Sequence, residues 1–229
     1  MNLAVPTDRK IDMLLNRRNW IRLVATAFGA SLNLTLPLAR AAEEAPDEMI
    51  RRMSMDVLST IKADKDVQSG DVRKIINFVD TTIMPKVNFL RMTASAVGRS
   101  WRQATPEQQK RLQEEFKNLL VRTYAGALSQ VQDQTINVKP LRSQAGDTEV
   151  IVRTEILGRG EPIQLDYRME KTAGGWKIYD LNVLGVWLVE TYRTQFAQEI
   201  SARGIDGLIA TLSLRNKNGA LASAGPKKN

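Results

Sequence analysis

The side chains that carry most enzyme and metal chemistry are absent from this sequence. Its 229 residues include no Cys and no His. The chain therefore has no disulfide, no thiolate nucleophile, no imidazole general base and none of the usual zinc ligand sets. After residue 41 it also lacks a nucleophile elbow, a Ser-x-x-Lys pair, a phosphate-binding glycine loop and a dinucleotide fingerprint. No cofactor is expected, and most hydrolase chemistry is excluded.

Carboxylates are the remaining candidates for acid and base chemistry. Asp166 and Glu170 alternate onto the polar side of an expected strand, which favours a solvated surface over a catalytic pair. Asp180 follows Tyr179 inside an apolar strand, and a buried Asp needs a partner. The favoured interpretation of Asp180 is a structural hydrogen bond that pins this strand to the next helix. The alternative is a small-molecule enzyme with Asp180 as its acid or base.

The first 41 residues predict an export signal. The basic cluster Arg17–Arg22 runs into residues 23–38, of which ten of sixteen are Leu, Val, Ala or Phe, and Ala39-Arg40-Ala41 forms a small-x-small site. The apolar stretch is shorter than the roughly 20 residues that span a bilayer. Paired arginines resemble the twin-arginine export pattern, with an ordinary secretory signal as the alternative. We expect cleavage near Ala41, a periplasmic protein and no nucleic-acid partner.

The charge balance changes when this segment is removed. The whole chain has 33 basic and 25 acidic residues, and residues 1–41 hold six and two of them, which leaves 27 against 23. The remaining excess of four positive charges could favour anionic lipid headgroups or an acidic partner, although a solvated surface is the commoner meaning. With 43% apolar residues, we expect one globular domain over residues 42–215.

Apolar residues between Asp47 and Leu128 recur every three or four positions, which predicts helices. Pro85 and Gly98 are expected to end two of them. The clearest start is Thr105–Gln108, in which Thr is the N-cap, Pro the first helical residue and Gln the partner of a capping box. The inner stripe of this helix is Leu112, Phe116, Leu119, Leu120, Tyr124 and Leu128.

After Ser129 the apolar period changes to two, which predicts strands. We expect an antiparallel meander with one wet face, joined by turns at Gly158–Glu161 and Gly174-Gly175. Its strands are expected at residues 136–141, 148–157, 163–171 and 176–183.

The helical period returns beyond Gly185, and Gly204 is expected to separate two last helices. Residues 216–229 are poor in large apolar side chains, so a disordered tail is expected. The order helices, sheet, helices predicts an α+β fold, in which helices pack on one face of the antiparallel sheet. A pocket could open between these layers.

Several segments, in this order and spacing, resemble the MlaC family of periplasmic phospholipid-binding proteins, also called toluene-tolerance auxiliary proteins. The likeness covers roughly Asp47 to Leu214. Family members typically carry Glu and Ser where this chain has Leu184 and Trp187, and both changes add apolar bulk. The segments are Gly98–Trp101, Ala104–Gln108, Trp176–Asp180, Gly185-Val186, Tyr192–Phe196 and Gly204–Leu208.

The resemblance implies a lipid carrier without catalytic activity. Its implied partners are phospholipid, an outer-membrane lipoprotein complex and an inner-membrane transporter with a mammalian-cell-entry-type subunit, in a system that maintains outer-membrane lipid asymmetry. At about 0.8 kcal/mol per buried CH₂, two chains of about 15 methylenes represent roughly 24 kcal/mol of exclusion from water. Free lipid therefore crosses an aqueous gap slowly, and a carrier must offer its tails a dry cavity.

The resemblance makes one apolar group the candidate lining of that cavity. Taken alone, these stripes are equally explained by a packed core. The alternative function is accordingly a periplasmic binding or scaffold module with a filled core and no lipid ligand. The candidate lipid-binding residues are Phe116, Leu120 and Tyr124 on the helix, opposite Val150, Val152, Ile156, Ile163, Leu165, Tyr167 and Met169 on the sheet.

Overall fold

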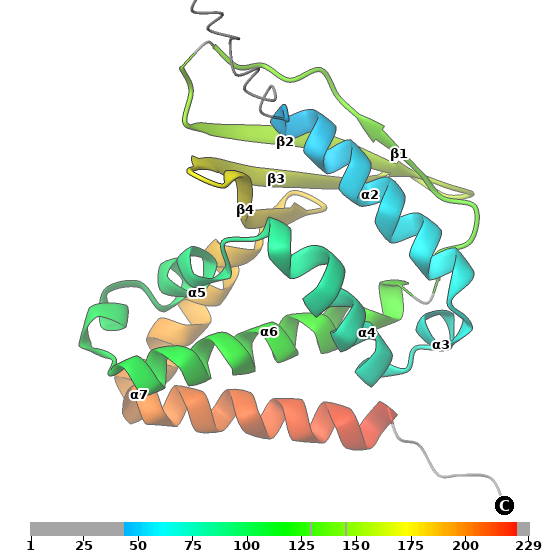
Figure 1. Cartoon of the computed structure of the whole chain (residues 1–229). Helices are drawn as coiled ribbons and strands as arrows, with labels where there is room; N and C mark the ends of the chain where they lie inside the picture. Colours follow the sequence, from blue (N-terminus) through cyan, green and yellow to red (C-terminus); the bar gives the residue numbers. More distant parts are fainter. Residues whose placement is uncertain (1–43, 129, 145, 224–229) are drawn as a thin grey trace, which may run out of the picture. The chain divides into compact units, whose positions relative to one another are not determined.

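Helices and one antiparallel sheet form separate layers in the computed structural model (Figure 1), which describes residues 44–128, 130–144 and 146–223. This arrangement confirms the predicted α+β fold. The expected export segment, residues 1–41, lies outside the described residues, and so does the last part of the expected tail, residues 224–229.

The first half of the described chain is helical, as expected. Side chains of Asp64, Asp71 and Asn88 accept hydrogen bonds from backbone N–H groups at three of the helix starts. The Thr105 hydroxyl accepts from the Gln108 N–H at 3.2 Å while the Gln108 amide accepts from the Thr105 N–H at 3.0 Å, so the predicted capping box is confirmed. The elements are α2 (Pro46–Ala63), α3 (Lys65–Gln68), α4 (Val72–Phe78), a π-helical turn (Val79–Ile83), a 3₁₀ turn (Met84–Lys86), α5 (Phe89–Val97), a second 3₁₀ turn (Gly98–Gln103) and α6 (Pro106–Leu128).

The sheet is a meander in which each strand pairs with the next along the chain. The first strand ends before the expected Leu141, because Pro140 has no N–H to donate to the ladder. A fifth strand of two residues was not expected. The strands are β1 (Thr135–Val138), β2 (Glu149–Leu157), β3 (Ile163–Thr172), β4 (Gly175–Val183) and β5 (Val186–Trp187).

A tight two-residue hairpin joins β4 to β5. Val183 pairs with Val186, and the two residues between them both have positive φ, 53° at Leu184 and 88° at Gly185. Paired positive φ values are typical of a type I′ turn, where Asn-Gly is the preferred sequence. Leu184 therefore occupies a left-handed conformation that suits a glycine or asparagine better, and it is 65% exposed.

A β-bulge in β4 controls which side chains share the inner face of the sheet. Arg168 pairs with Asp180 but Met169 pairs with Ile178, which leaves Tyr179 as the extra residue. Because of this bulge, Ile178 and Leu181 both pack in the same apolar cluster although they are three residues apart.

Helix α2 covers the inner face of the sheet (Figure 1). Met49, Ile50 and Met53 on this helix pack against strand residues that are themselves almost fully buried. We call this group the sheet cluster. Its buried strand members are Val138, Val150, Val152, Tyr167, Met169 and Ile178.

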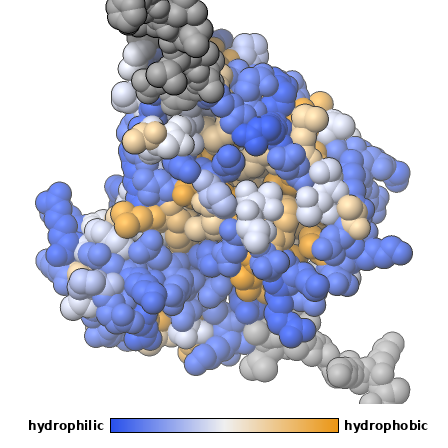
Figure 2. All heavy atoms as spheres, viewed as in Figure 1, coloured by the Kyte–Doolittle hydropathy of each residue, from blue (hydrophilic) through white to orange (hydrophobic). Residues whose placement is uncertain are grey.

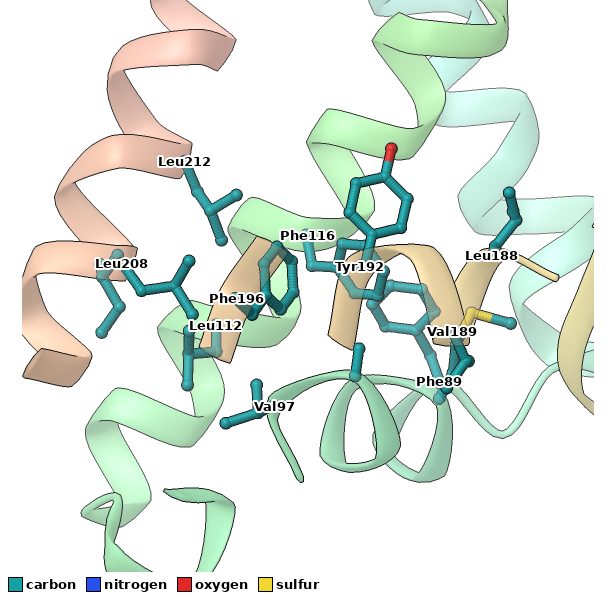
Figure 3. Packing of buried hydrophobic residues seen from close by; sticks show 13 residues of the cluster. Phe89, Val97, Leu112, Phe116, Leu188, Val189, Tyr192, Phe196, Leu208 and Leu212 are labelled. Carbon is teal, nitrogen blue, oxygen red and sulfur yellow. The ribbon is translucent and has the colours of Figure 1, made fainter. Parts of the chain in front are cut away.

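A second apolar group, the helical cluster, lies among α5, α6 and α7 (Leu188–Ser223). Its centre is the ring of Phe116, whose centroid lies 5.7 Å from that of Phe89, 4.9 Å from that of Tyr192 and 5.2 Å from that of Phe196. Tilted and edge-on pairs of this kind each contribute about 1 kcal/mol beyond area burial. Figure 3 shows these rings together, with the Tyr192 hydroxyl pointing away from them.

Helix α7 bends sharply at Gly204, where φ is 70° and ψ is −176°, so the expected break between two helices is confirmed. Its second half runs beside α6 (Figure 1). The helix continues to Ser223, so the expected disordered tail does not begin at Asn216. Asn216 is buried and its amide nitrogen donates to the backbone carbonyl and the carboxylate of Glu115, at 3.0 and 2.7 Å. Composition alone did not reveal this tertiary contact.

Candidate functional site

An apolar seam separates the sheet cluster from the helical cluster. Val87 and Leu181 are the partly buried side chains that pack against both of them. Figure 2 shows apolar side chains gathered between the sheet and the helices on the viewed face. A packed core that is divided in this way can separate along the seam at a lower cost than a single continuous core.

A cavity of about 290 Å³ lies at one end of this seam, between α6, the β4–β5 hairpin and both halves of α7. Leu188 and Tyr192 are buried and form its floor, whereas Thr123, Val186, Gln195 and Arg215 are exposed and form its rim. The half-buried residues of its wall are Leu119, Tyr124, Val183 and Thr191.

Local sequence explains why these side chains converge. Leu188, Tyr192 and Gln195 follow a spacing of four and three, so they share one face of the first half of α7. Leu119 and Thr123 are four apart on α6. The bend at Gly204 turns the chain, and the second half of α7 brings Arg215 back to the rim.

The cavity wall carries one formal charge at neutral pH. Burial raises the pKa of the Tyr124 hydroxyl above its ordinary value. Burial also raises the pKa of Tyr192, and the neighbouring Tyr124 adds to this effect. Both phenols are therefore neutral near pH 7, and none of the wall residues is acidic. The arrangement suits an apolar ligand whose polar end lies near the Arg215 guanidinium.

The structure divides the predicted lining residues between different surroundings. Tyr124 lies in the cavity wall, and Phe116 and Leu120 pack in the helical cluster. Val150, Val152, Tyr167 and Met169 are buried beneath α2, with the half-buried Leu165 packed against them. Ile156 is half-buried and Ile163 is 43% exposed at the end of the sheet.

The predicted direct opposition of α6 and the inner sheet face is therefore not what the structure shows. Helix α2 lies on that face instead. Both helices carry an apolar stripe, so periodicity could not decide which of them covers the sheet. The cavity wall also includes Leu119, Leu188 and Tyr192, which the helical periodicity marked as inward-facing without indicating a ligand.

Asp180 has the structural role that its sequence context favoured. One carboxylate oxygen accepts hydrogen bonds from the N–H groups of Leu181 at 2.8 Å and Val189 at 3.1 Å. The other accepts from Arg168 at 3.0 Å, and the Arg168 guanidinium also stacks 3.9 Å from the centre of the Trp187 ring. Burial raises the pKa of Asp180, opposed by these hydrogen bonds. Strand β4 is thereby pinned to the first turn of α7.

Asp166 is a correction to the expected wet sheet face. It is only 4% exposed, and its carboxylate accepts from the Gln164 amide at 2.7 Å and from the Thr154 N–H at 3.3 Å. Glu170, expected to be solvated with it, binds Arg91 and Asn88. Alternation alone placed these side chains on the correct face but could not show that their polar neighbours cover them.

Two further kinds of site were examined within residues 44–128, 130–144 and 146–223. No group of three or more acidic, Cys or His side chains there could hold a metal ion. No helix in the same described part is both long and apolar enough to cross a membrane.

Fold and cavity together define an α+β protein with an apolar ligand cavity between its layers. The family model described as "MlaC protein" matches residues 51–214. The chain belongs to the MlaC family.

Known relatives extend over most of this chain. It is 26% identical to the toluene tolerance protein ttg2D of Pseudomonas putida, over 74% of this chain and 80% of that protein. It is 22% identical to the intermembrane phospholipid transport system binding protein MlaC of Haemophilus influenzae, over 87% and 94%.

A solved structure is closer in sequence. The phospholipid-binding protein of Ralstonia solanacearum, solved in complex with a phospholipid, is 48% identical to this chain with a TM-score of 0.76. The match covers 77% of this chain and 99% of that one.

Proposed function

We propose that this protein binds a phospholipid, with acyl chains in the cavity between α6, α7 and the β4–β5 hairpin, and carries it across the periplasm. The observation that supports this most strongly is the apolar cavity of about 290 Å³ with a charged rim, in a chain 48% identical to a phospholipid-binding protein. A polar end in water and apolar chains in a dry cavity is the arrangement that a membrane lipid requires.

The cavity must enlarge to hold two acyl chains. Its volume of about 290 Å³ is at the lower limit of the roughly 300–1,000 Å³ typical of small-ligand pockets. The seam offers the direction of enlargement, because the wall residue Val183 is directly paired with Leu165 on the inner sheet face. Leu181 and Tyr167 form the next row, and Tyr167 in turn pairs with Val152.

Acyl chains that enter at Val183 would therefore extend along the predicted sheet residues as α2 and the helical layer move away from the sheet. This path gives the predicted lining residues a role even though most of them are now packed. Burying about 30 methylenes at about 0.8 kcal/mol each supplies far more free energy than the separation of a few apolar contacts costs.

The transport role rests on family membership and on the export signal predicted in residues 1–41. In this proposal the protein exchanges phospholipid with an outer-membrane lipoprotein complex and with an inner-membrane transporter that has a mammalian-cell-entry-type subunit. The exchange would maintain the lipid asymmetry of the outer membrane. The proposal includes no catalytic step, and the one buried carboxylate considered for catalysis, Asp180, is fully engaged in structural contacts.

Two tryptophan variants test where the acyl chains lie. Leu119→Trp fills the cavity from α6, and Leu165→Trp obstructs the path along the sheet. If both surfaces contact lipid, each variant should remain folded and lose most of the phospholipid that copurifies with the wild type, as measured by native mass spectrometry and solvent extraction. Glu114→Trp, on the exposed side of α6, is the matched control and should keep its lipid.

The other outcomes separate the alternatives. If Leu165→Trp keeps full lipid occupancy and only destabilises the fold by the roughly 1–3 kcal/mol typical of overpacking, the inner sheet face is permanent core and the lipid path is confined to the cavity. If no phospholipid accompanies the wild-type protein, the proposed function is wrong and a binding or scaffold module with a filled core replaces it.

A further inference from the structure

The rim of the cavity carries an arginine without a carboxylate partner. Arg215 is exposed, lines the cavity, and makes no salt bridge or side-chain hydrogen bond with the described residues. Other arginines at element boundaries are paired: Arg168 binds Asp180 and Glu190, and Arg91 binds Glu149 and Glu170. An unpaired guanidinium at the mouth of an apolar cavity is available to a ligand.

The surroundings of Arg215 suit one negative charge. The cavity wall has no acidic residue, and its polar groups are the neutral Thr123, Tyr124, Thr191, Tyr192 and Gln195. The positive charge of Arg215 lowers the pKa of Tyr192 against the larger effect of burial, which indicates that the guanidinium lies close to that hydroxyl. Low local polarity strengthens a charge-assisted hydrogen bond at this position.

We propose that Arg215 binds the phosphate of the lipid and thereby restricts the cavity to phosphate-bearing lipids, an inference that rests on the proposed phospholipid-binding function. The guanidinium presents a planar set of N–H donors that fits two non-bridging phosphate oxygens, whereas the hydroxyl of a diacylglycerol offers no charge. The rim is open to water beyond Arg215, so the group attached to the phosphate projects into solvent. Arg215 selects for the phosphodiester and not for choline, ethanolamine or glycerol.

A pair of fluorescent lipids tests this assignment. Delipidated protein is titrated with phosphatidylglycerol and with diacylglycerol that carry the same acyl chains and the same tail fluorophore. Arg215→Gln should weaken phosphatidylglycerol binding about tenfold or more, as expected for loss of a charge-assisted hydrogen bond, and leave diacylglycerol binding unchanged. Arg215→Lys retains the charge without the planar donors and should show an intermediate loss for phosphatidylglycerol.

Lys217→Gln is the matched control. Lys217 lies on the same helix, is exposed and is not part of the cavity wall, so its removal changes the net charge by the same amount. It should leave both affinities unchanged. Raising the salt concentration should weaken phosphatidylglycerol binding to the wild type more than to Arg215→Gln.

Each remaining outcome overturns the assignment in a distinguishable way. Equal losses for both lipids would show that Arg215 supports the cavity and does not recognise phosphate. Unchanged affinities would show that it does not contact the ligand. Inorganic phosphate that displaces phosphatidylglycerol from the wild type at low millimolar concentration would indicate a site for free phosphate. If the wild type binds neither lipid, the proposed function itself is wrong.

Discussion

Individual buried polar groups record how tightly the sheet is closed. The Tyr167 hydroxyl lies in the sheet cluster, hydrogen-bonded to Ser54 of α2 and to Thr154 of β2, and burial raises the pKa of Tyr167 to about 12. This phenol reports directly on the contact between α2 and the sheet, the contact that must loosen if acyl chains pass along the inner face.

Tyr167 should make the folded protein sensitive to high pH. The unfolded state releases this proton near pH 10 and the folded state only near pH 12, so the stabilisation is complete below pH 10 and is lost as pH rises toward 12. At pH 11 the loss is about 1 kcal/mol. Urea unfolding at pH 8 and pH 11 should show a smaller pH-dependent decrease for Tyr167→Phe than for the wild type. Equal decreases in the two proteins would contradict the assignment.

Leu184 shows that a residue can depart from local preference beside a site. A non-glycine residue with φ of 53° costs on the order of 1 kcal/mol or more, and its side chain is exposed. Val183 and Val186 on either side of the turn are both cavity residues. The strained turn therefore lies at the cavity, where such strain is commonly found.

Among the elements, the junction of β4 and α7 determines where the cavity floor lies. Asp180 holds the Val189 N–H at the start of α7, and the next residues of that helix include the floor residue Tyr192. The junction explains how a two-residue strand and a helix start can position the cavity wall without any disulfide or metal.

Substitutions at Asp180 should affect stability and leave lipid occupancy intact. Asp180→Ala leaves Arg168 and two backbone N–H groups without their partner and should cost about 3 kcal/mol in the free energy of unfolding. Asp180→Asn keeps an acceptor and should cost about 1 kcal/mol. Glu190→Gln removes the exposed, more distant carboxylate of Arg168 and should change stability by less than about 0.5 kcal/mol. Loss of lipid in a folded Asp180→Asn protein would argue against a purely structural role.

Local patterns predicted the elements well because each was determined by near neighbours. The capping box at Thr105 and Gln108, the alternation of β2 and β3, and the break at Gly204 all rest on interactions within a few residues. The two-residue β5 was missed because it is too short to show a period. The end of α7 was missed because Asn216 is held by Glu115 on another helix.

The candidate site was harder to predict because it depends on which layers meet. Ten apolar residues were assigned to one lining, but α2 covers the inner sheet face and Tyr124 is the member of that set in the cavity wall. The rim residue Arg215 has no sequence pattern that distinguishes it from other surface arginines. It becomes noticeable only when the bend at Gly204 brings it to the cavity.

At the scale of the whole molecule, the sheet cluster and the helical cluster are two cores that meet along one seam. Two cores give the protein two stable layers and one weaker boundary. A carrier needs such a boundary, because it must enclose acyl chains during transit and release them at a membrane. The cavity at the end of the seam is where separation of the layers would begin.

The measurement that tests this account most directly is photo-cross-linking with a phospholipid that carries a diazirine at the end of one acyl chain. After irradiation and digestion, mass spectrometry locates the labelled residues. Labels should fall within the cavity wall, at residues 119–124 and 188–195, and on the paired strand residues Val183 and Leu165. Labelling confined to exposed apolar residues such as Met55 and Leu90, with none in the cavity, would contradict the central claim that the acyl chains lie between the two layers.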